Sequence, residues 1–171
     1  MHATRVDAAA LLTFNALEAR LLRQVLQTVR GHYRLQPAEL DSALNALWYS
    51  TQGCRSAGMS PEETREWVEA LHAIKRSNLQ LLESALDQLS GAPEKPPRIR
   101  LRLDEVPIFL TIINDHRLLS AARGEIGQKE MDLHSFRGIN TLKPAQQAAL
   151  YEIHLLAYVM EELLRLLENP D

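Results

Sequence analysis

The fold class is decided by residues 60–90, SPEETREWVEALHAIKRSNLQLLESALDQLS. Ser60 is a good N-cap, proline suits the first helical position, and the two glutamates that follow favour the positive end of a helix dipole. From Trp67 to Leu89, apolar residues recur at helical spacing. The stretch therefore predicts one long amphipathic helix that ends near Ser90.

Similar signals elsewhere in the chain predict about five helices. Their expected starts are a capping box at Asn15 and Glu18, Pro37, Ser60, Asp104 and Pro144. Each is followed by leucine-rich residues with one apolar face. We therefore expect an all-α fold, a single-domain helical bundle that spans residues 1–171 around one core.

Two short segments interrupt the helical pattern in the middle of the chain. Residues 91–97, GAPEKPP, cannot continue a helix and are predicted to be a semi-rigid connector between two helical halves. Residues 98–103, RIRLRL, alternate with the period of a strand. Because no second strand is predicted, we expect one short extended segment whose apolar residues lie against the helices.

The composition limits the classes of partner. The chain has 171 residues, 46% of them hydrophobic and 24% charged, with a formal net charge of -3. This balance gives no overall attraction to nucleic acid or to an acidic membrane surface. No apolar run reaches the roughly 18 residues that a membrane-spanning helix needs. With a single cysteine, Cys54, no internal disulfide is possible. We expect a cytoplasmic protein with no membrane partner, and the role of Cys54 stays open.

No motif of metal binding or catalysis stands out. Glu69 and His72 have the Glu-x-x-His spacing that di-iron bundles use twice, but the chain offers no second copy. The sequence contains no nucleophile elbow, phosphate-binding glycine loop or zinc-protease motif. We therefore expect no metal, no cofactor and no enzymatic activity.

Asn114, Asp115 and Arg117 are the most informative polar residues. Asp115 and Arg117 each lie on a stripe of the predicted fourth helix that is otherwise apolar. Being two residues apart, they cannot pair along the helix, and a buried charge needs a partner. The candidate partners are Arg20 or Arg23 for Asp115, and Glu18, Glu161 or Glu162 for Arg117. Two interpretations remain open, an interhelical polar clasp and a recognition or ligand site.

A second set of polar residues, Arg98, Arg100 and Arg102, projects from one face of the extended segment. At strand spacing these side chains stand roughly 6.6 Å apart and could contact phosphates or an acidic protein surface. The alternative is a solvated edge whose charges prevent unwanted strand pairing. A nucleic-acid partner is therefore the weaker hypothesis.

Three segments resemble a known family. Residues 113–118, INDHRL, with Arg123 and Ile126 after them, are similar to the Leu-Asn-Asp-Leu-Arg-Leu segment of the bacterial domain-of-unknown-function family DUF2017. Residues 14–23 and 151–164 resemble its opening and closing helices. The resemblance implies a helical fold without established enzymatic activity. Members tend to be encoded near the Clp-protease adaptor ClpS and a metalloprotease of sulfur metabolism, which implies a role in regulated proteolysis or stress response.

Together these observations predict a non-enzymatic protein-interaction or regulatory module. Apolar residues off the main face of the last helix would suit a protein partner or a homodimer; they are Leu155, Tyr158, Leu163 and Leu166. One alternative is a small-ligand-binding protein or enzyme that uses Asn114, Asp115 and Arg117. Another is a nucleic-acid-associated regulator that acts through Arg98, Arg100 and Arg102.

Overall fold

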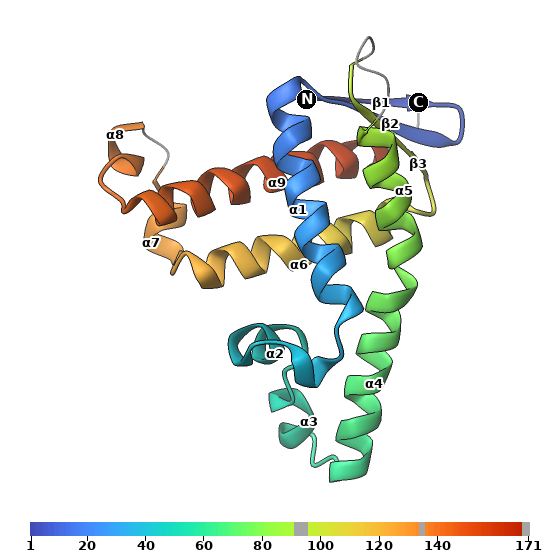
Figure 1. Cartoon of the computed structure of the whole chain (residues 1–171), viewed down its shortest axis with the longest axis vertical. Coiled ribbons are helices and arrows are strands. Elements are labelled where there is room, and N and C mark those ends of the chain that lie inside the picture. Colours follow the sequence, from blue (N-terminus) through green and yellow to red (C-terminus); the bar gives the residue numbers. More distant parts are fainter. Residues whose placement is uncertain (91–95, 134–135, 169–171) are drawn as a thin grey trace.

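The computed structural model describes residues 1–90, 96–133 and 136–168 (Figure 1). The helices are α1 (Ala16–Arg34), α2 (Ser42–Trp48), α3 (Gln52–Ser56), α4 (Pro61–Ser77), α5 (Leu79–Leu89), α6 (Val106–Arg123), α7 (Gln128–Met131), α8 (Phe136–Ile139) and α9 (Pro144–Glu168), with a 3-10 helix η1 (Pro37–Glu39). The strands are β1 (His2–Val6), β2 (Ala9–Thr13) and β3 (Arg98–Arg102). Of the predicted connector, residues 91–95 lie outside the described residues.

The mainly helical fold is confirmed, but the all-α class is wrong because the chain also forms a three-stranded antiparallel sheet. The strand order is β1-β2-β3, and β2 pairs with β3 in a register that places Leu12 opposite Ile99. The predicted extended segment is therefore a paired strand. Its partner hairpin turns tightly at Asp7, whose φ of 55° is a left-handed conformation that aspartate tolerates.

The edge of β3 that faces away from β2 is covered by a side chain of α5. The side chain of Gln88 accepts a hydrogen bond from the backbone N–H of Arg100 at 2.8 Å and donates one to the backbone carbonyl oxygen of Arg100 at 3.3 Å. These are the two bonds that a neighbouring strand would make. The side chain of Gln88 therefore takes the place of a fourth strand at this position.

Several helix boundaries agree with the predictions. The capping boxes at Asn15 and Ser60 are both formed, and the last helix begins at Pro144. The long helix predicted over residues 60–90 is instead two helices, because the helix is interrupted at the buried Asn78. The fourth predicted helix has Glu105 rather than Asp104 as its N-cap.

The core lies between α1, α5, α6 and α9 and includes buried side chains of the sheet. In Figure 1, α6 and α9 run side by side and α1 crosses them, while the sheet packs near α5. Fully buried side chains from these elements fill the interior; they are Leu22, Leu26, Phe109, Ile112, Ile113, Leu156, Val159, Ile99 and Leu101. Within the described residues, no helix combines the length and apolar character needed to cross a bilayer.

The last helix exposes a different set of apolar side chains from the one predicted. Leu163 is fully buried in the core, and Leu166 packs against it. Tyr158 is exposed as expected, but Leu164 and Leu167 are exposed as well. The prediction assigned the wrong face because α9 is covered on more than one side, by α6 and by β1.

Candidate functional site

Asp115 on α6 lies at the centre of a buried polar cluster. Its Oδ2 forms an ion pair with the ammonium group of Lys75 on α4, and the hydroxyl of Tyr33 on α1 donates to the same oxygen at 2.6 Å. The side chains of Asp115 and Lys75 are only 12% and 10% exposed. The indole N–H of Trp48 on α2 donates to the Asp115 carbonyl oxygen at 3.3 Å, and the Lys75 ammonium lies 4.6 Å from the centre of the Trp48 ring.

This cluster joins α1, α2, α4 and α6, and its electrostatics keep the Tyr33 hydroxyl protonated. Burial raises the pKa of Tyr33, and the adjacent charge of Asp115 raises it further. Burial and the same carboxylate raise the pKa of Tyr49 to about 12. A protonated phenol can donate to the carboxylate, so the geometry supports the clasp interpretation of Asp115.

The partners of Asp115 differ from those predicted. Lys75 and Tyr33 take the place of Arg20 and Arg23, and Arg23 instead donates to the carbonyl oxygen of Leu89. In the sequence, Lys75 lies beside Arg76 in the middle of the predicted helix and resembles an ordinary surface lysine. No feature of the sequence therefore marked it as buried.

Arg117 and Asn114 are not part of the buried cluster around Asp115. The guanidinium of Arg117 lies 3.7 Å from the sulfur of Met160, and both Asn114 and Arg117 are half-buried. The acids predicted to pair with Arg117 are engaged elsewhere. Glu18 pairs with the Met1 ammonium, while Glu161 and Glu162 both contact Arg165.

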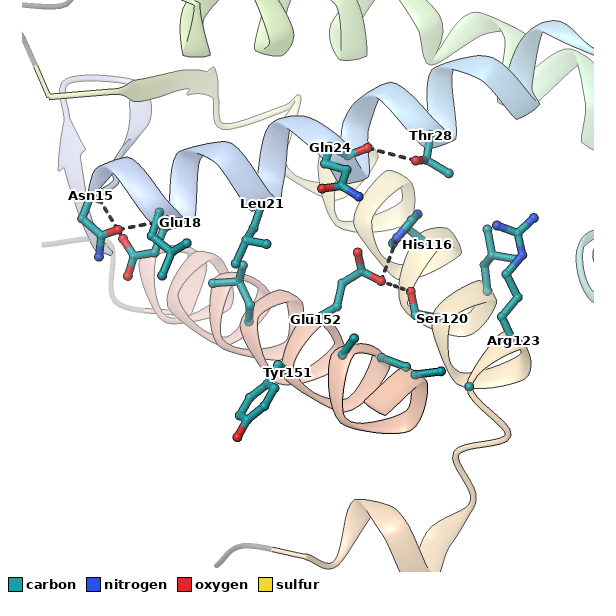
Figure 2. Close-up of a pocket in the computed structure, with 17 residues that line it drawn as sticks. Asn15, Glu18, Leu21, Gln24, Thr28, His116, Ser120, Arg123, Tyr151 and Glu152 are labelled. Atoms are coloured by element: carbon teal, nitrogen blue, oxygen red, sulfur yellow. Dashed lines mark hydrogen bonds and ion pairs between the residues drawn. The ribbon is translucent and has the colours of Figure 1, made fainter. Parts of the chain in front are cut away.

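A wide pocket opens on the other side of α6, between α1, α6 and α9, and we call it the α1/α9 groove (Figure 2). Its volume is about 970 Å³. Apolar side chains make most of the wall; they are Leu17, Leu21, Leu119, Ala145, Ala148, Ala149 and Leu155. Leu17 is 55% exposed and Leu21 is 37% exposed. At one end α6 and α9 approach so closely that a Cβ on Gly124 would lie 2.5 Å from the Cβ of Ala149.

The polar centre of the groove is Glu152 on α9, which points from that helix toward His116 and Ser120 on α6 (Figure 2). The hydroxyl of Ser120 donates to Glu152 Oε2, and His116 Nε2 lies 3.1 Å from the same oxygen. Burial by itself raises the pKa of Glu152, but the contacts with His116 and Ser120 and the charge of Arg123 lower the pKa below its usual 4.5. Glu152 is therefore ionised at neutral pH.

His116 is a buried imidazole whose ring nitrogens are poorly satisfied. Its side chain is 7% exposed, and neither nitrogen has a hydrogen-bond partner of good geometry among the described residues, since the short contact to Glu152 is not aligned as a hydrogen bond. The ring therefore lies beside the Glu152 carboxylate with Nδ1 buried and without a hydrogen-bond partner among the described residues.

These three side chains do not form a hydrolase triad. In such a triad the serine donates to the imidazole, whereas Ser120 and His116 both contact the Glu152 carboxylate. Among the described residues, no group of three or more histidines, cysteines, aspartates and glutamates could hold a metal ion. The groove can bind a hydrogen-bond donor at Glu152, but it lacks an activated nucleophile.

The predicted basic patch lies on the exposed face of β3. Arg100 is 3.8 Å from Asp7, and Arg102 pairs with Asp104 at 2.8 Å and with Glu105 at 3.5 Å. Neighbouring carboxylates therefore offset much of the charge that nucleic acid would need. This geometry supports the alternative of a charged, solvated surface.

Cys54 lies on α3 as a free and buried thiol. Only 5% of the residue is exposed, so reagents and partner thiols have little access to it. The structure thus gives Cys54 the surroundings of a small packing residue.

Sequence reasoning missed the polar centre of the groove. His116 and Ser120 are four residues apart on one face of α6, a spacing that was readable. Glu152 comes from another helix, however, and the sequence does not show that this helix packs against α6 with these side chains together. The groove therefore emerges only when α6 and α9 are packed together.

Comparison with known proteins gives one match. The family described as Domain of unknown function (DUF2017) matches residues 1–167. No curated protein and no solved structure matches the chain.

Proposed function

The chain belongs to the DUF2017 family, and we propose that it is a non-enzymatic protein-interaction module that binds a helical segment of a partner protein in the α1/α9 groove. The observation that supports this proposal is the pair of large apolar side chains left exposed on the groove wall, Leu17 and Leu21. Tyr151 on the opposite wall is 44% exposed. Apolar side chains gathered in one concave surface are typical of partner-binding sites.

The shape of the groove favours a helix as its occupant. Small side chains on α9, Ala145, Ala148 and Ala149, leave room for another backbone to approach. An amphipathic helix presents apolar residues at positions i, i+3, i+4 and i+7, which would contact leucines on one wall and the alanines on the other. The groove volume of about 970 Å³ lies at the upper end of small-ligand pockets, so a protein segment fills it better than a metabolite would.

The polar residues of the groove support binding rather than catalysis. The hydroxyl of Ser120 donates a hydrogen bond to the Glu152 carboxylate rather than to an imidazole, so the groove lacks the serine–histidine pair of a hydrolase. Asp115 is enclosed in the core by Lys75 and Tyr33, out of reach of a substrate. Both arrangements support a binding protein without catalytic activity.

The proposal can be tested with a displayed library of amphipathic helical peptides panned on the purified protein. We expect enriched peptides to lose about tenfold in affinity for Leu21→Ala, because a leucine at the centre of an interface contributes about 1.5 kcal/mol or more. Leu164→Ala is the matched control, since Leu164 is an equally exposed leucine on α9 outside the groove. Enriched peptides that bind both variants like the wild type would refute the proposal.

A role in regulated proteolysis or stress response is a narrower version of the same proposal. It rests on the family resemblance and concerns the identity of the partner. Titrating purified ClpS into the isotope-labelled protein tests it directly. Shifts of groove residues such as Leu21 and Tyr151 are expected if ClpS supplies the helix, and an unchanged spectrum at high ClpS concentration would exclude ClpS as the partner.

A further inference from the structure

We infer that Glu152, at the centre of the α1/α9 groove, receives a guanidinium or ammonium group, the basic side chain of the bound helix. This inference rests on the proposed function and specifies the chemistry of the partner. It predicts a helix whose apolar face is interrupted by one arginine or lysine.

The Glu152 carboxylate is held in a fixed position. Ser120 and His116 both contact Oε2, one by a hydrogen bond and the other at 3.1 Å. Their contacts hold the side chain in place and leave Oε1 for a ligand. The side chain of Glu152 is 27% exposed, so a group in the groove can reach it.

The arginine that lines the groove is committed to a carboxylate other than Glu152. This residue, Arg123, is 3.6 Å from Asp41 and pairs with that carboxylate. The other acid of the groove, Glu18, already pairs with the Met1 ammonium at 2.6 Å.

A bound helix with an apolar or an acidic residue opposite Glu152 would lose binding free energy. A purely apolar helix would cover the Glu152 carboxylate and remove its water without supplying a donor, which is unfavourable for an ionised group. An acidic side chain on the bound helix would repel the Glu152 carboxylate. A guanidinium or ammonium group forms a charge-assisted hydrogen bond and lets the apolar walls close around its methylene stem.

The test compares a charged probe with its uncharged analogue. Hexylguanidinium and hexylurea are titrated separately into the isotope-labelled protein, and amide shifts are followed for wild type and for Glu152→Gln, which keeps the shape of the side chain. We expect hexylguanidinium to shift groove residues of the wild type and to bind about 10- to 100-fold more weakly to the variant, as loss of a charge-assisted hydrogen bond implies. Hexylurea should bind both proteins weakly.

A second measurement needs no mutation. Peptides enriched from the helical library are synthesised with arginine or with its uncharged analogue citrulline, and both are measured on the wild type. Citrulline should weaken binding about 10- to 100-fold. Equal binding of the two peptides would overturn the inference, and so would equal binding of hexylguanidinium and hexylurea. Sensitivity of the same peptides to Leu21→Ala would in that case leave the proposed function standing, so the two failures are distinguishable.

Discussion

Replacing Lys75 with methionine tests whether the buried cluster around Asp115 stabilises the fold. Methionine retains the length of the side chain and much of its apolar contact but removes the ammonium group. Asp115, with its side chain 12% exposed, would then have only the Tyr33 hydroxyl as a side-chain donor. Leaving one member of a buried ion pair unpaired typically costs about 3–5 kcal/mol.

That change is large enough to measure by two methods. At about 2–4 °C per kcal/mol for a chain of this size, the expected fall in Tm is roughly 6–20 °C. Urea unfolding should show the same loss in the free energy of unfolding. Tryptophan fluorescence is a suitable signal, since Trp48 lies against the Lys75 ammonium.

Arg65→Ala is the matched control on the same helix. Arg65 also forms ion pairs, at 3.2 Å with Glu62 and 3.8 Å with Glu69, but its side chain is 66% exposed. Its removal should change the free energy of unfolding by less than about 1 kcal/mol.

The double variant Lys75→Met, Asp115→Asn separates charge from packing. It removes both charges and keeps an amide oxygen that can accept from Tyr33, so it should be more stable than Lys75→Met alone. The reasoning is refuted if Lys75→Met costs less than about 1 kcal/mol, or if the double variant is less stable still.

Three further predictions concern packing, pH and capping. Gly124→Ala should lower the free energy of unfolding by about 1–3 kcal/mol in urea titration, because the added methyl would lie 2.5 Å from the Cβ of Ala149; an unchanged midpoint would contradict the tight contact. Burial lowers the pKa of His32 below 6.5, so the unfolded chain binds its proton first and stability should fall as pH decreases below about 6.5. His32→Gln should flatten this part of the pH–stability curve, and an equally steep curve would contradict the assignment. Ser60→Ala should cost about 1 kcal/mol in thermal unfolding through loss of the N-cap, whereas the neighbouring Thr64→Ala should change Tm less.

The features that the sequence predicted well are local ones. The capping boxes at Asn15 and Ser60 involve groups three residues apart, and Pro144 fixes the start of a helix by its own geometry. Such signals act before any tertiary contact forms. They depend little on the rest of the fold, which is why the helix starts were readable.

The sheet was missed because its stability is non-local. β2, Ala-Ala-Leu-Leu-Thr, is rich in good helix formers, and by itself it does not favour a strand. It becomes one because β3 pairs with it and buries Ile99 and Leu101 against the helices. Tertiary packing therefore overrides the local preference of this segment.

In the candidate sites, too, the features within one helix were predictable and the contacts between helices were not. The apolar surroundings of Asp115 on its helix correctly indicated a buried carboxylate in need of a partner. Its partner Lys75 lies on another helix, and the choice among the cations of the chain depends on packing that the sequence does not display. Glu152 and His116 were missed for the same reason, since two separate helices bring them together.

The pairing of β2 with β3 has a consequence for the order of folding. Thr13 lies opposite Arg98, so this part of the sheet closes only after the ends of the intervening chain, with α1 to α5, have been brought together. Closing a long loop is entropically unfavourable, and contacts of this kind slow the search for the native state. We expect the helices to appear early in refolding and protection of the Leu101 amide to appear late. Pairing of β2 with β3 is then the last step that joins the N-terminal hairpin to the residues before α6.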